Sequence, residues 1–233
     1  MSSIQEKTIT LEDVKQILEY YFKNTKKEEA DIEVHFWGNS FASLKNDVQR
    51  NILELLEKYQ KEEKIKQIRI SIRPQDIYKE NLKLWKKYKV KELSLQVYSM
   101  STYLLEKIDI QDSIKHIQKV VKKLRWHGFS VGIEMLIGMP EATKLDEQNT
   151  AKEIVKLKPH FVKIEPVLVE EKSLLEEKYQ KEEYVALSIV QAVERCKEVA
   201  HIFNQNKIPE IKVALPEQNN IVAGPYHPEF TML

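Results

Sequence analysis

Residues 31–44 read DIEVHFWGNSFASL, and this stretch contains the unit that decides the fold. Its first half alternates like a β-strand, with Ile32, Val34 and Phe36 on one side and polar or amphipathic residues between them. The residues that follow, Trp-Gly-Asn-Ser at 37–40, have the composition of a tight turn, and a helical pattern begins after them. A strand that passes through a glycine turn into a helix is a common cradle for a small ligand. The stretch therefore predicts one βα unit whose turn is a candidate binding element.

The same strand–helix rhythm recurs along the chain. Expected strands span residues 31–36, 67–72, 92–98, 130–136, 161–167 and 210–215. Expected helices span residues 11–24, 44–60, 81–88, 111–127, 147–158, 173–181 and 187–207. Strands that alternate with helices predict an α/β protein with a parallel sheet, and a spacing of roughly 30 residues fits a barrel or half-barrel.

The predicted strands have one apolar and one polar face, whereas a parallel sheet covered on both faces reads as nearly continuous Val, Ile and Leu. Ile68, Ile70 and Ile72, for example, alternate with Arg69 and Ser71. A closed eight-stranded barrel fills its interior with branched apolar side chains, and unpaired buried charges are too costly for a dry core. We therefore expect an open, partial (β/α) TIM-type barrel with a wet polar cavity.

Composition sets the outer limits on function. The 233 residues include 37 Lys+Arg and 36 Asp+Glu, so the net charge is near zero and does not indicate binding to nucleic acid. No apolar run of about eighteen residues is present, and the N-terminus lacks the apolar core of a signal peptide. We expect a cytoplasmic protein without a membrane partner. Its single domain, residues 1–233, includes an N-terminal segment (1–10) and a C-terminal tail (216–233) that packs on the barrel.

Six stretches of the sequence carry a resemblance to a known family. They are EVHFWGNSF (33–41), RISIRPQD (69–76), SLQVYSM (94–100), GFSVGIEMLIGMPEAT (128–143), KLKPHFVKIEPVLV (156–169) and VAGPYHPEF (222–230). On these stretches the chain resembles the radical S-adenosylmethionine (SAM) enzymes, and within them the short bacterial group related to the Elongator catalytic subunit. The resemblance implies a partial TIM-type barrel in which the first strand of the radical SAM core is missing.

The chain departs from this family at the cysteines. The family signature is Cys-x3-Cys-x2-Cys, on a loop after the first strand, and it holds a [4Fe–4S] cluster whose open iron binds SAM. Residues 1–10, MSSIQEKTIT, begin roughly where the family resumes after that loop, and Cys196 is the only cysteine. A thiolate-held cluster needs several cysteines, and Cys196 is expected to be an ordinary core residue. We therefore expect no cofactor in this chain: SAM binds weakly at best, and a [4Fe–4S] cluster forms only if a cysteine segment is supplied elsewhere.

The resemblance also implies a set of SAM-contacting positions, but no catalytic residue and no metal ligand. At three of them, Ser94, Gln96 and Tyr98 replace the Glu, Gly and Gln of the family. Lys172 and Glu182 stand where the family prefers glycine, in keeping with a total of only 5 glycines. The candidate cofactor-binding residues are Trp37, Gly38, Asn39, Ser40, Arg73, Ser94, Gln96, Tyr98, Glu134 and Gly138.

Several candidates keep two interpretations. Glu33 and His35 are expected to pair with Arg69 or Arg73 rather than act in catalysis. Arg73 either orients a substrate carboxylate or ends a strand in a structural Arg-Pro pair. Glu134 is expected to be a buried ion-pair partner rather than a base.

These observations support three hypotheses on function. The leading one is a catalytically silent radical-SAM-like protein, a pseudoenzyme or binding module. The alternative is a truncated radical SAM enzyme, dependent on [4Fe–4S] and SAM, whose cysteine segment lies upstream or on a partner and which acts on RNA or a small metabolite. The third is a stable remnant without a ligand. The missing first strand leaves residues 31–36 at an edge, which predicts a homodimer, a partner strand or coverage by residues 1–10.

Overall fold

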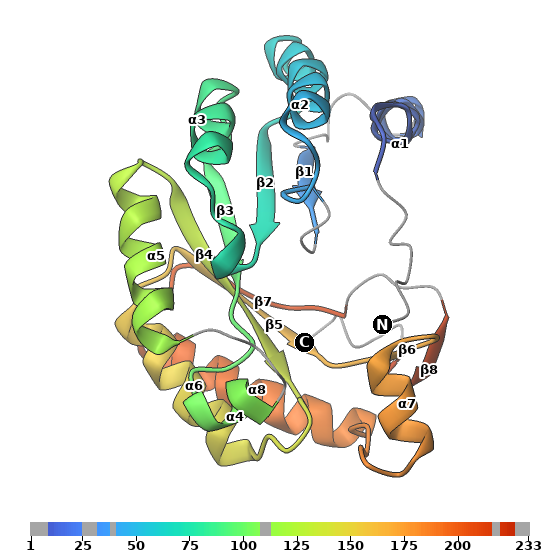
Figure 1. Ribbon diagram of the computed structural model, residues 1–233, viewed down its shortest axis with the longest axis vertical. Coiled ribbons are helices and arrows are strands. Elements are labelled where there is room, and N and C mark those ends of the chain that lie inside the picture. Colours follow the sequence, from blue (N-terminus) through green and yellow to red (C-terminus); the bar gives the residue numbers. More distant parts are fainter. Residues whose placement is uncertain (1–8, 25–31, 38–40, 108–112, 216–219, 227–233) are drawn as a thin grey trace. The chain divides into compact units, whose positions relative to one another are not determined.

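The computed structural model describes residues 9–24, 32–37, 41–107, 113–215 and 220–226. Six strands form one sheet in the order β1-β2-β3-β4-β5-β7 (Figure 1), and the pairs β1–β2, β2–β3, β4–β5 and β5–β7 are parallel. The bounds of these strands are β1 Glu33–Phe36, β2 Gln67–Ile72, β3 Glu92–Gln96, β4 Ser130–Ile137, β5 Phe161–Pro166 and β7 Ile211–Val213. The prediction of an α/β fold with parallel strands of the partial TIM type is confirmed.

The chain divides into two compact units. In the described residues, the amino-terminal unit comprises 9–95 and 122–130, and the carboxy-terminal unit comprises 96–121 and 131–226, each less the gaps given above. The helices are α1 Leu11–Asn24, α2 Asn46–Lys61, α3 Lys79–Lys87, α4 Thr102–Lys107, α5 Ile114–Trp126, α6 Lys144–Lys156, α7 Leu174–Gln180 and α8 Ile189–Gln205. A single 3₁₀ turn, Pro74–Asp76, follows β2.

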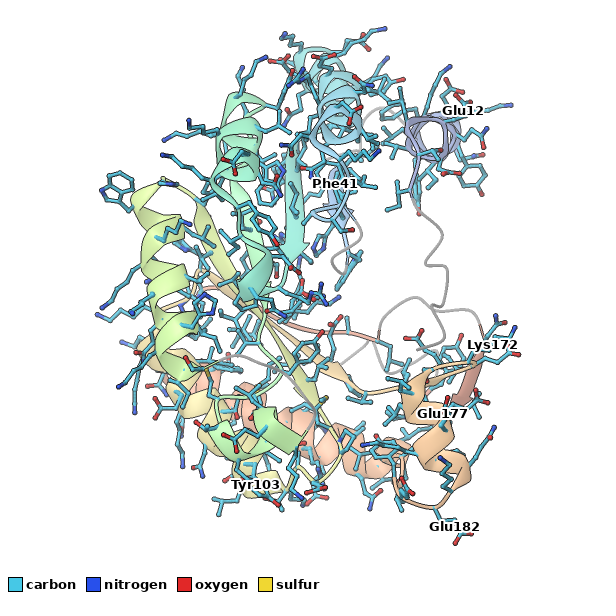
Figure 2. All side chains as sticks on the ribbon, viewed as in Figure 1. Glu12, Phe41, Tyr103, Lys172, Glu177 and Glu182 are labelled. Carbon is cyan, nitrogen blue, oxygen red and sulfur yellow. The ribbon has the colours of Figure 1, made fainter. Side chains whose placement is uncertain are left out.

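The amino-terminal unit is built around the apolar face of its strands. The three isoleucines of β2 are fully buried, as the alternating pattern predicts. Phe36 at the end of β1 stacks on Phe41, with ring centroids 4.1 Å apart (Phe41 is labelled in Figure 2). Trp85 on α3 is fully buried, and its indole Nε1 donates to Gln49 Oε1 on α2 at 2.8 Å. A buried hydrogen bond thus fixes α2 against α3, because the indole N–H has no access to water.

The carboxy-terminal unit places α6 and α8 against each other and α8 against β5 and β7. Both helices begin with a capping box, at Thr143 and Ser188, in which the cap side chain and the third helical residue exchange hydrogen bonds. Gly132 on β4 is required by packing, because a Cβ there would lie 2.0 Å from the Phe161 ring. A second, antiparallel pair joins β6 (Val169–Glu170) to β8 (Ile221–Ala223), which lies in the predicted tail.

Differences between predicted and observed elements fall on short segments. The strand expected over residues 92–98 ends at Gln96, and the helix expected over 111–127 begins only at Ile114 among the described residues. α4, β6 and β8 are not predicted. They are six residues long or shorter, so they contain too few residues for a hydrophobic period to stand out.

The polar faces of the strands differ from expectation. A wet cavity predicts exposed polar side chains, yet the structure buries the polar residues of these faces to 7 % exposure or less; they are Arg69, Ser71, Ser94, Glu134, Lys163 and Glu165. For these six residues the prediction of a wet lining is wrong. For Arg69, Lys163 and Glu165 the physical reason is pairing: an ion pair with an opposite charge on the same sheet lowers the cost of burying each charge.

Several turns hold non-glycine residues in left-handed backbone. Lys172 and Glu182, on either side of α7 in Figure 2, have φ of 64° and 60°. A non-glycine residue in this region strains the folded backbone by about 1–2 kcal/mol. Glycine removes this strain, but it also gives the unfolded chain more conformational entropy, which offsets part of the gain in stability. We expect Lys172→Gly and Glu182→Gly each to raise the free energy of unfolding by about 0.5–1 kcal/mol, measured by urea denaturation.

The matched control for this prediction is Lys178→Gly, an exposed position inside α7. Glycine in a helix interior costs about 1 kcal/mol, so this variant should be less stable than the parent chain. Destabilisation by glycine at Lys172 and Glu182 as well would contradict the argument from backbone strain.

Candidate functional site

The turn after β1 begins with Trp37, which is 41 % exposed. Its ring centroid lies 4.3 Å from that of His35, and His35 Nε2 lies 2.8 Å from Ser71 Oγ on β2. The next three candidate residues, Gly38, Asn39 and Ser40, lie outside the described residues. The structure therefore shows the entrance to the predicted turn, a tryptophan on an imidazole that is held by the neighbouring strand.

Arg73 stands at the carboxyl end of β2, directly before the 3₁₀ turn. Its Nε donates to Asp76 Oδ2 at 2.6 Å, and the Asp76 carboxylate supplies a counter-charge from within the same turn. This contact favours the structural interpretation of the Arg73-Pro74 pair. A ligand carboxylate would have to compete with Asp76 for the guanidinium.

Ser94 lies in the middle of β3, opposite Ser71 of β2 in the parallel register. It is fully buried, and its Oγ has no hydrogen-bond partner in the described part of the chain. The residue that replaces the family's glutamate is thus a short, enclosed hydroxyl. Next to it on the sheet, Arg69 is held by Glu92 through Nε and Nη2 at 2.7 Å and 2.6 Å, and Glu33 Oε1 accepts from Gln67 at 3.0 Å.

The other candidates belong to the carboxy-terminal unit. Gln96 ends β3 and is half-buried, and Tyr98 follows it in the loop. Glu134 on β4 is buried opposite Lys163 of β5, and Lys163 Nζ lies 2.6 Å from Glu165 Oε1. Burial lowers the pKa of Lys163 and raises that of Glu165, while their mutual attraction opposes both shifts. Glu134 adds a second carboxylate that favours the charged lysine, as the ion-pair interpretation of Glu134 expects.

Gly138 begins the loop after β4 with φ of +84°. A Cβ at this position would lie 2.6 Å from the Leu187 side chain, so apolar side-chain atoms already occupy the space that the glycine leaves. Its N–H donates to Glu147 Oε1 at 2.7 Å, and its carbonyl oxygen accepts from the Tyr184 hydroxyl at 2.8 Å. Both backbone groups are therefore used within the chain rather than turned to a ligand.

Three residues around Gly138 are not predicted from the sequence. Glu147 on α6 is 4 % exposed and accepts from Arg195 Nη1 of α8 at 3.1 Å. Burial raises the pKa of the Glu147 carboxyl, and burial also raises the pKa of Tyr184 to about 12. A signal was available for Glu147, because it shares the helical spacing 147, 150, 151 and 154 with the buried residues of α6.

A small pocket of about 10 Å³ lies beside this network, within the carboxy-terminal unit. Its lining combines the loop after β3, the end of β4, the loop that follows β4, α4 and the first two turns of α6. Tyr98 is the one lining residue that belongs to the candidate set. The other candidates that the structure describes do not line this pocket.

The residues present do not fit a [4Fe–4S] cluster. Cys196 on α8 is 1 % exposed, which confirms a core cysteine, and burial raises the pKa of its thiol to about 12. In the ranges that the structure describes, no group of three His, Cys, Asp or Glu could hold a metal ion. Two of the described candidates for SAM are also engaged elsewhere: Arg73 with Asp76, and Gly138 with Glu147 and Tyr184.

Comparisons with known proteins agree with the fold. The model of the radical SAM superfamily matches residues 3–154, and the model of the radical SAM C-terminal domain matches residues 159–233. The chain belongs to the radical SAM superfamily. No curated protein matches the sequence. In the described part of the chain, no helix has the length and apolar character needed to span a bilayer.

Several solved structures have a fold similar to that of this chain. An N-terminally deleted archaeal Elp3 from Methanocaldococcus infernus has a TM-score of 0.79 at 20% identity, over 95% of this chain and 57% of its own. SuiB of Streptococcus suis bound to S-adenosylmethionine gives 0.63 at 12% identity, over 93% and 45%. Coproporphyrinogen III oxidase (HemN) of Escherichia coli gives 0.56 at 17% identity, over 86% and 47%. The predicted resemblance to radical SAM proteins related to the Elongator subunit is confirmed, and this chain spans about half the length of these proteins.

Proposed function

We propose that this chain is a radical-SAM-like protein without an iron–sulfur cluster of its own, and that it works as a catalytically silent homologue or a binding module. The observation that carries the proposal is the lone cysteine. Cys196, on α8, is buried, and burial raises the pKa of its thiol to about 12, so the thiol stays protonated at neutral pH. A radical SAM cluster requires thiolate ligands, which this side chain does not supply.

Internal pairing of the sheet's polar residues supports the same proposal. Lys163 with Glu165, and Arg69 with Glu92, satisfy charges that would otherwise be available to a polar ligand. Arg73 is likewise paired, with Asp76. A sheet whose charges are matched within the chain has fewer groups left to hold a charged cofactor.

The second candidate is a truncated form of a radical SAM enzyme that acts on RNA or a small metabolite. It is favoured by one observation, the coverage of only 45% to 57% of the chains of the similar structures. In this case the cysteine segment is encoded upstream or carried by a partner. An in-frame Cys-x3-Cys-x2-Cys in the DNA before the start codon would favour this candidate over the first.

Binding of SAM to the isolated chain tests the proposal. We expect a dissociation constant in the millimolar range or weaker by calorimetry. Loss of the iron and of the family's glutamate at Ser94 removes two or three hydrogen bonds or coordinate contacts to charged groups. Each is worth about 1.5–3 kcal/mol, so affinity falls by roughly two to six orders of magnitude.

Two variants give this titration its internal controls. Any residual binding should weaken in Asn39→Asp, which adds a negative charge to the predicted turn, and in Arg73→Gln. Micromolar affinity in the parent chain would refute the proposal and indicate a cluster-independent use of SAM.

We also propose that the outer edge of β1 is covered by a second copy of the chain, by a partner strand or by residues 1–10. In the described residues β1 stands at the end of the strand order and pairs with β2. Such edges recruit further strands unless they are blocked. We expect slow amide hydrogen exchange across Glu33–Phe36, at a rate that depends on protein concentration if a second copy provides the cover. Fast exchange in a monodisperse monomer would exclude all three forms of cover.

A further inference from the structure

The ends of α3 and α5 meet in the amino-terminal unit. Lys86 Nζ, in the last turn of α3, donates at 3.0 Å to the carbonyl oxygen of His127, the residue directly after α5. The segments that lead from these helices into β3 and β4 also meet, because the Ser130 N–H donates to the Lys91 carbonyl oxygen at 2.8 Å. Residues 86–91 and 122–130 therefore lie side by side, and all of them belong to this unit.

This surface collects positive charge, although the whole chain is nearly neutral. Neither 86–91 nor 122–130 contains an acidic residue. None of their exposed lysines takes part in an ion pair among the residues that the structure describes. The pKa of His127 reflects the local charge: burial lowers it, and the neighbouring charges of Lys86 and Lys123 lower it further. We call this surface the α3–α5 patch; its exposed lysines are Lys86, Lys87, Lys89, Lys91, Lys122 and Lys123.

Trp126 stands at the end of α5, within the patch. It is 83 % exposed, more than any other large apolar side chain that the structure describes. Lysines in the last turn of a helix stabilise the helix dipole, so helix stability alone accounts for Lys86 and Lys123. It accounts neither for Lys89 and Lys91, which follow α3, nor for an indole left in water. A partner that attracts cations and also accepts an aromatic ring accounts for all of these residues.

Charge complementarity requires an anionic partner, and the composition of the patch favours lipid over nucleic acid. Nucleic-acid surfaces commonly use the planar fork of arginine and several aromatic rings that stack on successive bases. The patch instead presents lysines and a single exposed aromatic ring, and its one arginine, Arg125, is half-buried. Tryptophan at the level of the lipid head groups, with lysines that extend toward the phosphates, is typical of a membrane interface.

We propose that the α3–α5 patch docks on the surface of an anionic lipid bilayer, with the Trp126 ring among the head groups and the lysines facing lipid phosphates. Screening confines this attraction to about 8 Å at physiological salt, so acidic residues on other faces of the chain do not cancel it. The proposal is separate from the radical-SAM-like function. The patch lies at the amino end of β3, whereas Trp37 and Arg73 follow the carboxyl ends of β1 and β2.

Co-sedimentation of the full chain with vesicles tests the proposal. We expect binding at low salt to vesicles of phosphatidylglycerol and phosphatidylcholine in equal amounts, little binding to pure phosphatidylcholine, and release by high salt. Lys122→Gln with Lys123→Gln should weaken binding about thirtyfold, and Trp126→Ala about tenfold. The matched control is Lys178→Gln with Lys181→Gln, which removes the same charge from exposed positions at α7 and should bind like the parent.

Tryptophan emission shows whether the indole itself reaches the lipid. Phospholipids with brominated acyl chains should quench the emission of the bound parent chain, and this quenching should be lost in Trp126→Phe at vesicle concentrations that bind both chains. The proposal is overturned by a lack of binding to anionic vesicles at low salt, by equal binding of the two lysine double variants, or by equal quenching in Trp126→Phe. Binding of a single-stranded oligothymidine through the same lysines, without binding to vesicles, would assign the patch to nucleic acid and likewise overturn it.

Discussion

Anaerobic reconstitution of the isolated chain with iron and sulfide should yield no [4Fe–4S] cluster. Iron bound per chain should match that of a Cys196→Ala variant, and the visible absorbance of a cluster should be absent from both. The chain has a single cysteine to act as a cluster ligand. That residue, Cys196, is 1 % exposed, and burial raises the pKa of its thiol to about 12. Iron–sulfur clusters are held by several thiolates at once.

The variant separates specific from adventitious iron in this experiment. Loosely bound iron and sulfide colour both chains equally, whereas a cluster that uses Cys196 would be lost in Cys196→Ala. A stoichiometric, oxygen-sensitive cluster in the parent chain would overturn the leading proposal. Reconstitution that succeeds only after a cysteine-bearing segment is added would instead support the truncated-enzyme candidate.

Replacing Lys163, the buried lysine of β5, should lower the free energy of unfolding more than any of the other single substitutions proposed for stability measurements. Lys163→Met leaves the Glu165 carboxylate buried without its partner at 2.6 Å, and Glu134 loses a facing positive charge as well. Breaking a buried ion pair on one side costs about 3–5 kcal/mol. Urea denaturation at neutral pH should show a fall of this size in the free energy of unfolding.

Two further variants show whether burial is the cause. Lys156→Met removes an exposed partner of Glu153 on α6 and should cost less than about 1 kcal/mol. Lys163→Met combined with Glu165→Leu removes both charges, so it should recover a large part of the loss. A single Lys163→Met variant as stable as Lys156→Met would show that the interior around β5 is hydrated and screens the charge.

The longer helices and strands were predictable because each is long enough for its hydrophobic pattern to repeat several times. α1 has the predicted bounds Leu11–Asn24, and reciprocal hydrogen bonds between Thr10 and Asp13 cap its start. β2 occupies the predicted residues 67–72. The family was readable from segments of several residues, above all KLKPHFVKIEPVLV and the tail motif. Local patterns of this kind need no knowledge of which residues meet in space.

The pairing of side chains could not be predicted in the same way. The alternation around Arg69 identifies a polar face, but the sequence does not say that Glu92 on the neighbouring strand reaches its guanidinium. The network at Gly138 joins residues 46 and 57 positions away, Tyr184 and Arg195, through Glu147. Such contacts depend on how strands and helices that are distant in the sequence pack against one another. For this reason the sequence predicted a hydrated polar interior, whereas the structure pairs its charged side chains with one another.

The buried thiol of Cys196 makes local opening of the chain measurable, through the rate at which a thiol reagent labels it. A thiol reagent reacts with the thiolate, which burial suppresses in the closed state, so labelling must wait until α8 separates from its neighbours. Because no other cysteine competes, the labelling rate of the unmodified protein reports the opening equilibrium of one helix directly. Changes in that rate would reveal ligands or partners that act on the carboxy-terminal unit, even where they leave global unfolding unchanged.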